Sequence, residues 1–206
     1  RLPLLQRNEL TDAIGFDLDG PYVLVTYHPV TLVSGGEPAA LEALLEELKR
    51  YPNYKVVACY PNADTDGRRL IEILKRYENT EPDRVYLVRS LGQLRYLSLL
   101  KHCEAVLGNS SSGLIEAPAA GVPTLNIGKR QQGRITGATV LSCDANRTSI
   151  SAGLVKVLSK EFKTDCANAR NPYGGGDSSR VIVDKLISHK LEGLIEKSFY
   201  DLGNKS

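Results

Sequence analysis

The sequence predicts an α/β fold in which a doubly wound parallel sheet forms a single Rossmann-like domain. Short apolar runs rich in β-branched residues alternate along the chain with segments of helical spacing. The runs are apolar at consecutive positions, which is typical of parallel strands buried on both faces. Amphipathic helices follow them, as expected where helices cover both faces of such a sheet.

The strand predictions depend on short runs that end at polar or turn-forming residues. The run YVLVTY at 22–27 is apolar and β-branched, and it ends at His28 and Pro29. The run at 104–108 leads directly into three serines. The predicted strands cover residues 22–27, 55–60, 84–88, 104–108, 123–127 and 138–143.

The helix predictions depend on apolar spacing and on residues that favour helix ends. Within 37–51 the apolar residues recur at helical spacing, and Pro38 suits a first helical turn. The segment 177–191 is expected to form a helix capped by Asp177 or Ser178. The other predicted helices cover residues 67–77, 92–103, a short stretch after Ser112, and 149–162.

The predicted domain extends from residue 18 to residue 190, and 206 residues are enough for one sizeable core. Residues 1–17 contain no strand-like run and are expected to be an interdomain connector. Residues 191–206 are expected to be a C-terminal tail with a weak amphipathic helix. The chain contains no Met, even at position 1, so we expect it to be a trimmed piece of a larger molecule.

Composition favours a soluble cytoplasmic protein. The formal net charge is +2 and no basic block occurs, so nucleic acid is not implied as a partner. No apolar run approaches the roughly 20 residues that span a bilayer, and no signal peptide opens the chain. The four cysteines, at positions 59, 103, 143 and 166, lack metal-ligand spacing. We expect them to be reduced, and we expect no metal and no cofactor.

The predicted topology gathers polar residues at one edge of the sheet. Ligands of doubly wound sheets bind outside the carboxyl ends of the strands. Residues that directly follow a predicted strand therefore share one rim. They are His28, Arg89, Ser90, Asn109 to Ser112, and Gly128 to Arg130, with Arg134 four residues further on.

Three consecutive serines, Ser110, Ser111 and Ser112, are the leading candidate for a phosphate site. Helix N-termini present unpaired N–H groups and a positive dipole end. Small side chains let the backbone approach a phosphate, hydroxyls add donors, and Gly113 is expected to relax the turn. Simple helix capping is the alternative, but three serines followed by glycine exceed what a cap needs. A hydrolase nucleophile is not favoured, because Ser112 stands where the G-x-S-x-G pattern needs its second glycine.

Glu116 lies one helical turn beyond Ser112, and two interpretations of it are equally open. Its carboxylate suits vicinal hydroxyls, as the ribose-binding acid does in dinucleotide folds. It also suits the first turn of a helix, where it compensates the dipole. Pro118 limits this helix to little more than two turns.

The remaining candidates each have a structural alternative. Arg89, Arg130 and Arg134 have forked donors suited to phosphate, although solvation at the surface is the default for an arginine. Tyr96 is placed to stack on a base or to pack into the core. His28, fixed by the following Pro29, is placed for a role at the rim or as a structural histidine.

These residues, in this order, resemble the hydrolysing UDP-N-acetylglucosamine 2-epimerases of the sialic-acid pathway. The resemblance covers roughly residues 20–185. Its carriers are HPVT at 28–31, GNSSSGLIEAPAAGVPTLNIGKRQQGR at 108–134 and NPYGGGDSSR at 171–180. The non-hydrolysing relatives have H-R-R-E-N after the first strand, where this chain has HPVTL, so the resemblance favours the hydrolysing branch.

The resemblance implies one half of a GT-B-like two-domain enzyme, the C-terminal UDP-binding half. It implies that Ser110, Ser111, Ser112 and Gly113 hold the diphosphate and that Glu116 holds the ribose. It also places Tyr96 against uracil, the backbone around Ser90 and Leu91 at the base edge, and His28 and Arg134 near the diphosphate. His28 is implied, as a catalytic candidate, to assist the departure of UDP.

The implied reaction is loss of UDP from UDP-N-acetylglucosamine with proton abstraction at C2, then hydration to N-acetylmannosamine. The acids and bases acting at C2 are expected from an N-terminal domain that this chain lacks, so the chain alone is expected to be inactive. The alternatives are a UDP-diacetamido-sugar hydrolysing epimerase, a GT-B glycosyltransferase and a non-catalytic UDP-sugar-binding module. A homo-oligomer is also expected; the sequence gives neither its subunit number nor the acetylation of the sugar.

Overall fold

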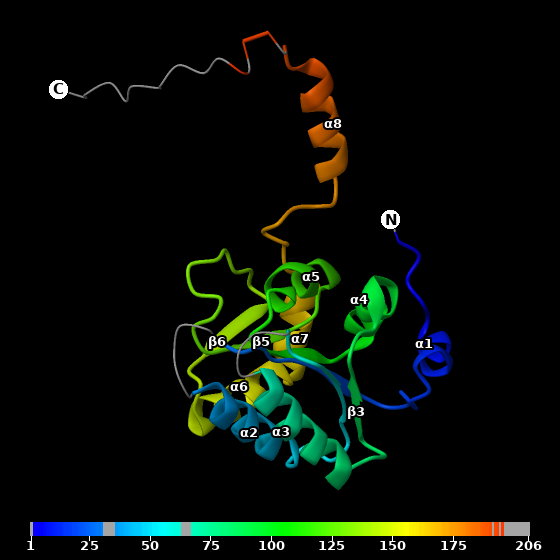
Figure 1. The fold of residues 1–206 in the computed structure, drawn as a ribbon, viewed down its shortest axis with the longest axis vertical. Helices are drawn as coiled ribbons and strands as arrows, with labels where there is room; N and C mark the ends of the chain where they lie inside the picture. The colour runs from blue at the N-terminus through cyan, green and yellow to red at the C-terminus, as the bar shows by residue number, and fades with distance from the viewer. Residues whose placement is uncertain (1, 31–35, 63–66, 191, 194, 196–206) are drawn as a thin grey trace, which may run out of the picture. The chain divides into compact units, whose positions relative to one another are not determined.

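Among the residues that the computed structural model describes, six parallel strands form one sheet in the order β3-β2-β1-β4-β5-β6 (Figure 1). The described residues are 2–30, 36–62, 67–190, 192–193 and 195. The strands are β1 Tyr22–Thr26, β2 Lys55–Cys59, β3 Val85–Val88, β4 Ala105–Gly108, β5 Thr124–Ile127 and β6 Val140–Cys143. The prediction of a doubly wound α/β fold is therefore confirmed.

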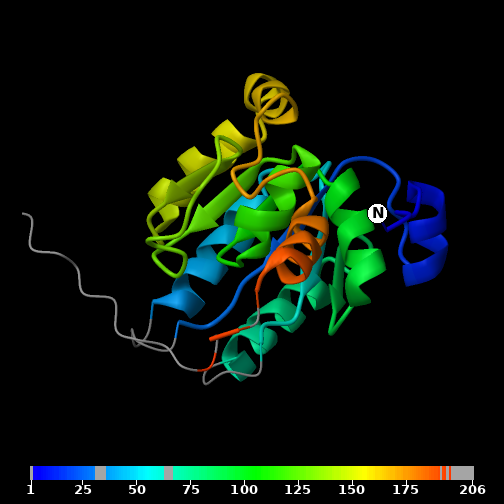
Figure 2. The ribbon, with the colours of Figure 1, turned by 90° about the horizontal axis from the view of Figure 1, so that it is seen from above.

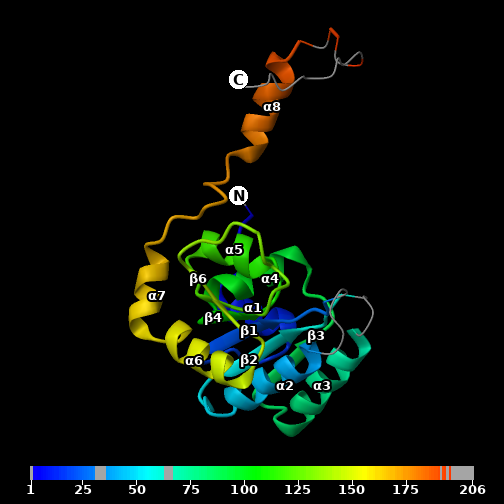
Figure 3. The same cartoon turned by 90° about the vertical axis from the view of Figure 1, so that its left-hand side faces the viewer.

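Helices cover both faces of the sheet, as Figure 3 shows from the side. One face carries α2 Glu37–Leu48, α3 Gly67–Thr80 and α6 Arg147–Val157. The other carries α1 Arg7–Ile14, α4 Gly92–His102 and α5 Ser112–Ala120. Two short helices complete the set, α7 Lys160–Ala167 and α8 Ser178–Ser188.

The central strand β1 contributes to two cores at once. Successive side chains of a strand point to opposite faces. Val23 and Val25 pack with the α2, α3 and α6 layer, whereas Leu24 packs with the α1, α4 and α5 layer. All five residues of β1 are buried, which explains why its sequence shows a continuous apolar run.

The predicted helix over 149–162 is wrong in its continuity, because the structure has two helices there. The first, α6, ends at Val157, and the second, α7, begins at Lys160. Ser159 adopts an extended conformation between them, and its hydroxyl accepts the Phe162 N–H at 3.2 Å. This side-chain cap gives α7 its own N-terminus.

Residues 7–14, within the expected connector, form a helix that packs against α4 (Figure 2). Leu10 is fully buried, and the Leu5 N–H donates to the Ser98 hydroxyl of α4 at 2.9 Å. Arg7 lies over the ring of Tyr22, 5.2 Å from its centroid. The predicted domain limits, residues 18 and 190, remain a prediction. In the structure α1 packs on the core, and the unit that contains the sheet extends to Tyr173.

A second unit begins at Gly174. Its helix α8 has no buried residue, and Asp177 is its N-cap without a side-chain hydrogen bond. Its apolar side chains are exposed, with Leu186 and Ile187 the most so. The weak helix predicted over 191–206 falls almost entirely outside the described residues. None of the helices in the described part of the chain has the length and apolarity for a membrane crossing.

Glu47 is a buried carboxylate that joins α2 to α6. Its side chain is 3% exposed, and its oxygens accept from Arg147 Nε at 2.7 Å and Ser151 Oγ at 2.8 Å. Arg50 Nη1 adds a third donor at 3.0 Å. These hydrogen bonds, led by Arg147, lower the pKa of Glu47 to about 2 against the opposing effect of burial. The ionised form is therefore the one that stabilises the packing of the two helices.

We predict that Glu47→Gln lowers the free energy of unfolding by about 2 kcal/mol at pH 7, because two arginines lose their anion. Since folding depresses this pKa from 4.5 to about 2, the stabilisation is present above pH 4.5 and fades as the pH falls toward 2. Urea unfolding across this pH range measures it. Glu42→Gln, which removes an exposed ion pair with Arg76, should change stability by less than about 0.5 kcal/mol. A loss from Glu47→Gln that stays constant down to pH 2 would contradict the assignment.

Candidate functional site

The strand order places the reversal of the sheet between β1 and β4. The chain adds strands on one side of β1 through β2 and β3, then crosses to the other side with β4. In open α/β sheets this switch point leaves a crevice outside the carboxyl ends of the two strands. His28 follows β1 and Ser110 follows β4, so both lie at this point.

β4 approaches β1 unusually closely at its last residue. Gly108 has a φ of 134°, and a Cβ built there would overlap the carbonyl oxygen of Thr26. Only glycine avoids both the conformational strain and the collision. This approach sets where the turn that carries the serines begins.

Asn109 then fastens three loops together. Its Oδ1 accepts the His28 N–H at 2.7 Å, and its Nδ2 donates to the His28 carbonyl at 2.8 Å. Its own carbonyl accepts from Gln131 Nε2 at 2.7 Å and from Arg130 Nη1 at 3.1 Å. Asn109 is 1% exposed, so these bonds are shielded from water. The ends of β1, β4 and β5 are thereby held in one arrangement.

The serine turn forms the N-terminus of α5. Ser111 is the N-cap residue, and its side chain makes no capping hydrogen bond. Ser112 N–H reaches Ser110 Oγ at 3.4 Å, at the long limit of a hydrogen bond. All three serines are half-buried. Ser110 thus accepts one N–H group at the helix start, as the capping alternative predicts, whereas the Ser111 hydroxyl makes no such bond.

Gly113 allows α5 to pack closely on β5; it does not relax the turn, as we had expected it to. It does not have a positive φ, and a Cβ there would lie 2.6 Å from Thr124 Cγ2. Its carbonyl accepts from Thr124 Oγ1 at 2.8 Å. The small residue thus lets α5 lie close against β5, as glycines do between the helix and strand of dinucleotide-binding folds.

Tyr96 is partly a core residue and partly a support for the serine turn. Its ring packs against the core on the α4 and α5 side, and its hydroxyl bonds to Ser112 Oγ at 2.6 Å. Burial raises the pKa of Tyr96, so the phenol stays protonated. Nearby, Ser90 is exposed and Leu91 is the buried N-cap residue of α4.

The arginines at the rim are in different settings. Arg130 binds the Asn109 carbonyl, and Arg89 lies over the Tyr60 ring, 5.9 Å from its centroid. Arg134 is exposed and lines a polar cavity of about 630 Å³ with Lys129 and Asp144, at the ends of β5 and β6. The structure therefore brings Arg130 to the switch point and places Arg134 beside the neighbouring strands.

Glu116 lies half-buried on α5, one turn after Ser112, as expected. The helix ends at Ala120, two residues after Pro118. His102 and His189 lie elsewhere, on α4 and at the C-terminus of α8.

In the described part of the chain, three buried side-chain oxygens without a hydrogen-bond partner lie near the same strand ends. Among the described residues, the buried side-chain oxygens without a hydrogen-bond partner belong to Thr26, Asn126, Gln131 and Thr139. Thr26 is the last residue of β1, Asn126 pairs with Gly108 at the end of β4, and Gln131 follows β5. Thr139 instead precedes β6, at the opposite edge of the sheet. Such groups are costly in a folded interior, and their concentration favours a functional region.

The sequence does not predict a role for Gln131 or Asn62. Gln131 holds Asn109, and the Asn62 N–H donates to His28 Nδ1 at 3.1 Å. Asn109 was placed at the rim but given no role. Their position in the sequence could have indicated a role, because Asn62, Asn109 and Gln131 each lie within a few residues of the carboxyl end of a strand.

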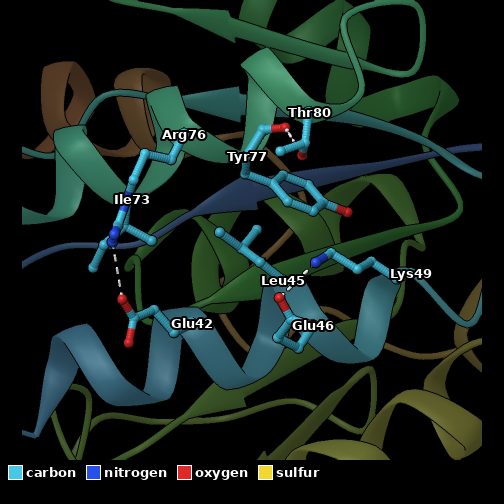
Figure 4. Close-up of a pocket in the computed structure, with 8 residues that line it drawn as sticks. All are labelled: Glu42, Leu45, Glu46, Lys49, Ile73, Arg76, Tyr77 and Thr80. Carbon is cyan, nitrogen blue, oxygen red and sulfur yellow. Dashed lines mark hydrogen bonds and ion pairs between the residues drawn. The ribbon is translucent and has the colours of Figure 1, made fainter.

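A second cavity, of about 370 Å³, lies between α2 and α3, away from the strand ends (Figure 4). Figure 4 shows Glu42 of α2 directed toward Arg76 of α3, with a distance of 3.0 Å between them, and Tyr77 between the helices. Its charged residues pair with each other, so it does not compete with the rim as a candidate site.

The metal-ligating and thiol side chains of the described residues lie apart from one another. No three His, Cys, Asp or Glu side chains in the described ranges lie where they could share a metal ion. The four cysteines are free, and burial raises the pKa of each thiol, to about 11 for Cys59 and about 12 for Cys103.

The fold and the rim together define a Rossmann-like domain with the N-terminus of a helix, α5, at its switch point. The family model for UDP-N-acetylglucosamine 2-epimerase matches residues 4–187. The chain therefore belongs to the UDP-N-acetylglucosamine 2-epimerase family.

Individual relatives support this assignment. The Campylobacter jejuni GDP/UDP-N,N'-diacetylbacillosamine 2-epimerase (hydrolyzing) is 34% identical over 199 residues, 96% of this chain and 51% of the relative. The Escherichia coli polysialic acid biosynthesis protein P7 is 32% identical over 186 residues, 88% of this chain and 46% of the relative. The chain thus spans about half the length of the curated relatives it matches.

Solved structures share the fold. The UDP-GlcNAc 2-epimerase from Neisseria meningitidis, solved with UDP-GlcNAc, superimposes with a TM-score of 0.65 at 23% identity. The match covers 88% of this chain and 48% of that one. It extends the agreement to the sheet and its helices.

We predict that Gly108→Ala lowers the free energy of unfolding by about 3 kcal/mol or more, because the methyl group collides with the Thr26 carbonyl at a strained φ. Chemical denaturation measures the change. Gly20→Ala is the matched control, since Gly20 has a φ of 82° with no atom within 4 Å of its Cβ position. It should cost about 1 kcal/mol. Equal losses for the two variants would show that the close approach is unimportant.

Proposed function

We propose that this chain is the C-terminal, UDP-binding half of a hydrolysing UDP-sugar 2-epimerase. The observation that carries the proposal is the serine turn at the switch point, where the α5 N-terminus has no side-chain cap at Ser111. Family membership supplies the class of ligand, a nucleotide sugar.

The phosphate assignment is supported by charge and by fit. The positive end of α5 and the hydroxyls of Ser110 and Ser111 suit a diphosphate. Arg130 adds a cation next to Asn109, at the base of the same turn. Arg134 is proposed to meet the phosphate side of the ligand from the loop after β5.

The nucleoside assignment uses the residues around α4 and α5. Glu116 is proposed to accept hydrogen bonds from the ribose hydroxyls, because it lies one turn from the diphosphate. The backbone at Ser90 and Leu91 is proposed to contact uracil. Tyr96 already bonds to Ser112, so it is proposed to support the serine turn while its ring edge faces the base.

In the proposed reaction, the C1–O bond to UDP breaks while a base removes the proton at C2. Water then adds across the double bond of the intermediate and gives the 2-epimeric free sugar. UDP departs with negative charge, so preorganised donors at the serine turn lower the barrier electrostatically. The groups acting at C2 are proposed to come from a second domain, since the curated relatives are about twice as long.

Two sugars are candidates for the substrate. N-acetylglucosamine follows from the family description, and the product is then N-acetylmannosamine. A diacetamido sugar is favoured by the 34% identity to the Campylobacter jejuni diacetylbacillosamine epimerase. A cytoplasmic location is also proposed, because four free thiols suit a reducing compartment.

We predict that the chain binds UDP and that Ser111→Ala and Glu116→Ala each weaken binding about tenfold, through loss of one hydrogen bond to a charged or vicinal group. Isothermal titration calorimetry with UDP measures this.

Glu46→Ala, which removes an exposed carboxylate of α2 paired with Lys49, is the control and should leave affinity unchanged. Absence of binding at millimolar UDP would refute the proposal. Formation of N-acetylmannosamine from UDP-N-acetylglucosamine by the chain alone would show that the C2 chemistry is wrongly placed in a second domain.

A further inference from the structure

The Nδ1 atom of the His28 ring can only be a hydrogen-bond acceptor in this structure. The Asn62 backbone N–H donates to His28 Nδ1 across 3.1 Å. A backbone N–H is always a donor, so Nδ1 must be the acceptor and carry a lone pair. In a neutral imidazole the proton then lies on Nε2.

The main chain on both sides of the ring is also fixed. Asn109 receives the His28 N–H and donates to the His28 carbonyl, at 2.7 and 2.8 Å. The last paired residues of the two strands are Thr26 and Gly108. The Asn109 side chain thus makes the two hydrogen bonds to His28 that a neighbouring strand would make, just after the paired residues end. Pro29 restricts the backbone that follows.

The residue that donates this hydrogen bond, Asn62, lies against the start of α3. A Cβ at Gly67, the first residue of α3, would lie 2.8 Å from the Asn62 carbonyl oxygen and 3.9 Å from Pro29 Cγ. The Asn62 carbonyl therefore lies close against the start of α3, while the N–H of the same residue faces the imidazole.

We propose that Asn109 and the Asn62 N–H are positioning groups that fix His28 as the Nε2–H tautomer, so that His28 donates a hydrogen bond at the switch point and does not act as a base there. A proton on Nδ1 would point at the Asn62 N–H, so the observed hydrogen bond requires the lone pair at that nitrogen. With respect to UDP this inference rests on the proposed function: the Nε2–H would donate to a phosphate oxygen of the departing nucleotide. The tautomer itself does not depend on that function.

The tautomer is tested by long-range ¹H–¹⁵N NMR of the imidazoles in the 206-residue chain at pH 8, where histidine is largely neutral. We expect Nδ1 of His28 to be unprotonated and Nε2 protonated. His102 serves as an internal reference, because its Nε2 lies 3.1 Å from the Leu5 carbonyl, which can only accept. An Nδ1–H tautomer of His28 would overturn the inference.

Variants at Asn62 separate its backbone from its side chain. Asn62→Pro removes the N–H and should shift His28 toward a mixture of tautomers, whereas Asn62→Ala keeps the N–H and should leave the spectrum unchanged. Gly67→Ala pushes on the Asn62 carbonyl and should give a partial shift; it replaces Asn62→Pro if that variant does not fold. A spectrum that Asn62→Pro and Gly67→Ala both leave unchanged would overturn the role of the Asn62 N–H.

The direction of the hydrogen bond is tested by calorimetry with UDP. The amide nitrogen of glutamine reaches the position of Nε2, and that of asparagine reaches the position of Nδ1. His28→Gln should therefore weaken UDP binding less than about threefold, and His28→Asn about tenfold. Equal or reversed losses would contradict a donor at Nε2. If the unchanged chain does not bind UDP at all, the proposed function fails, while the NMR result still decides the tautomer.

Discussion

The close approach of β4 to β1 at Gly108 is the constraint on which the rest of the site depends. The absent side chain lets the two strands end almost in contact, and Asn109 then continues the pairing with its amide. A larger residue at 108 would move Asn109, and with it the loops that end β1 and β5. The position of the α5 N-terminus follows from this geometry, because the serine turn begins at the next residue.

Contacts from β5 and α4 fix the orientation of α5. Gly113 allows close contact with Thr124 of β5, and Tyr96 bonds to Ser112 from α4. The helix is therefore held from two sides, while Ser111 at its N-terminus carries no capping bond. Most of the structure satisfies its buried polar groups, yet oxygens at Thr26, Asn126 and Gln131 are left without partners near the strand ends. Polar groups left unsatisfied beside a helix N-terminus whose N-cap side chain makes no capping bond suit a preorganised anion site.

Much of this could be predicted from the sequence because it depends on local pattern. Continuous apolar runs identified each strand in the part of the chain that the structure describes, and their ends placed His28 and the serines on one rim. The break at Ser159 was missed, because a serine within an amphipathic pattern has no distinctive spacing. The packing role of Gly113 and the bonds of Asn109, Asn62 and Gln131 could not be predicted, since each depends on contacts between segments distant in sequence. Helix α1 was missed because a short helix with one buried residue, Leu10, gives a weak apolar pattern.

The most direct measurement is a crystal structure of the chain grown with UDP. The account predicts pyrophosphate density at the N-terminus of α5, within hydrogen-bond distance of the Ser110 to Ser112 turn, with the ribose directed toward Glu116. Nucleotide density in the cavity between α2 and α3, or at any place away from the ends of β1 and β4, would contradict it.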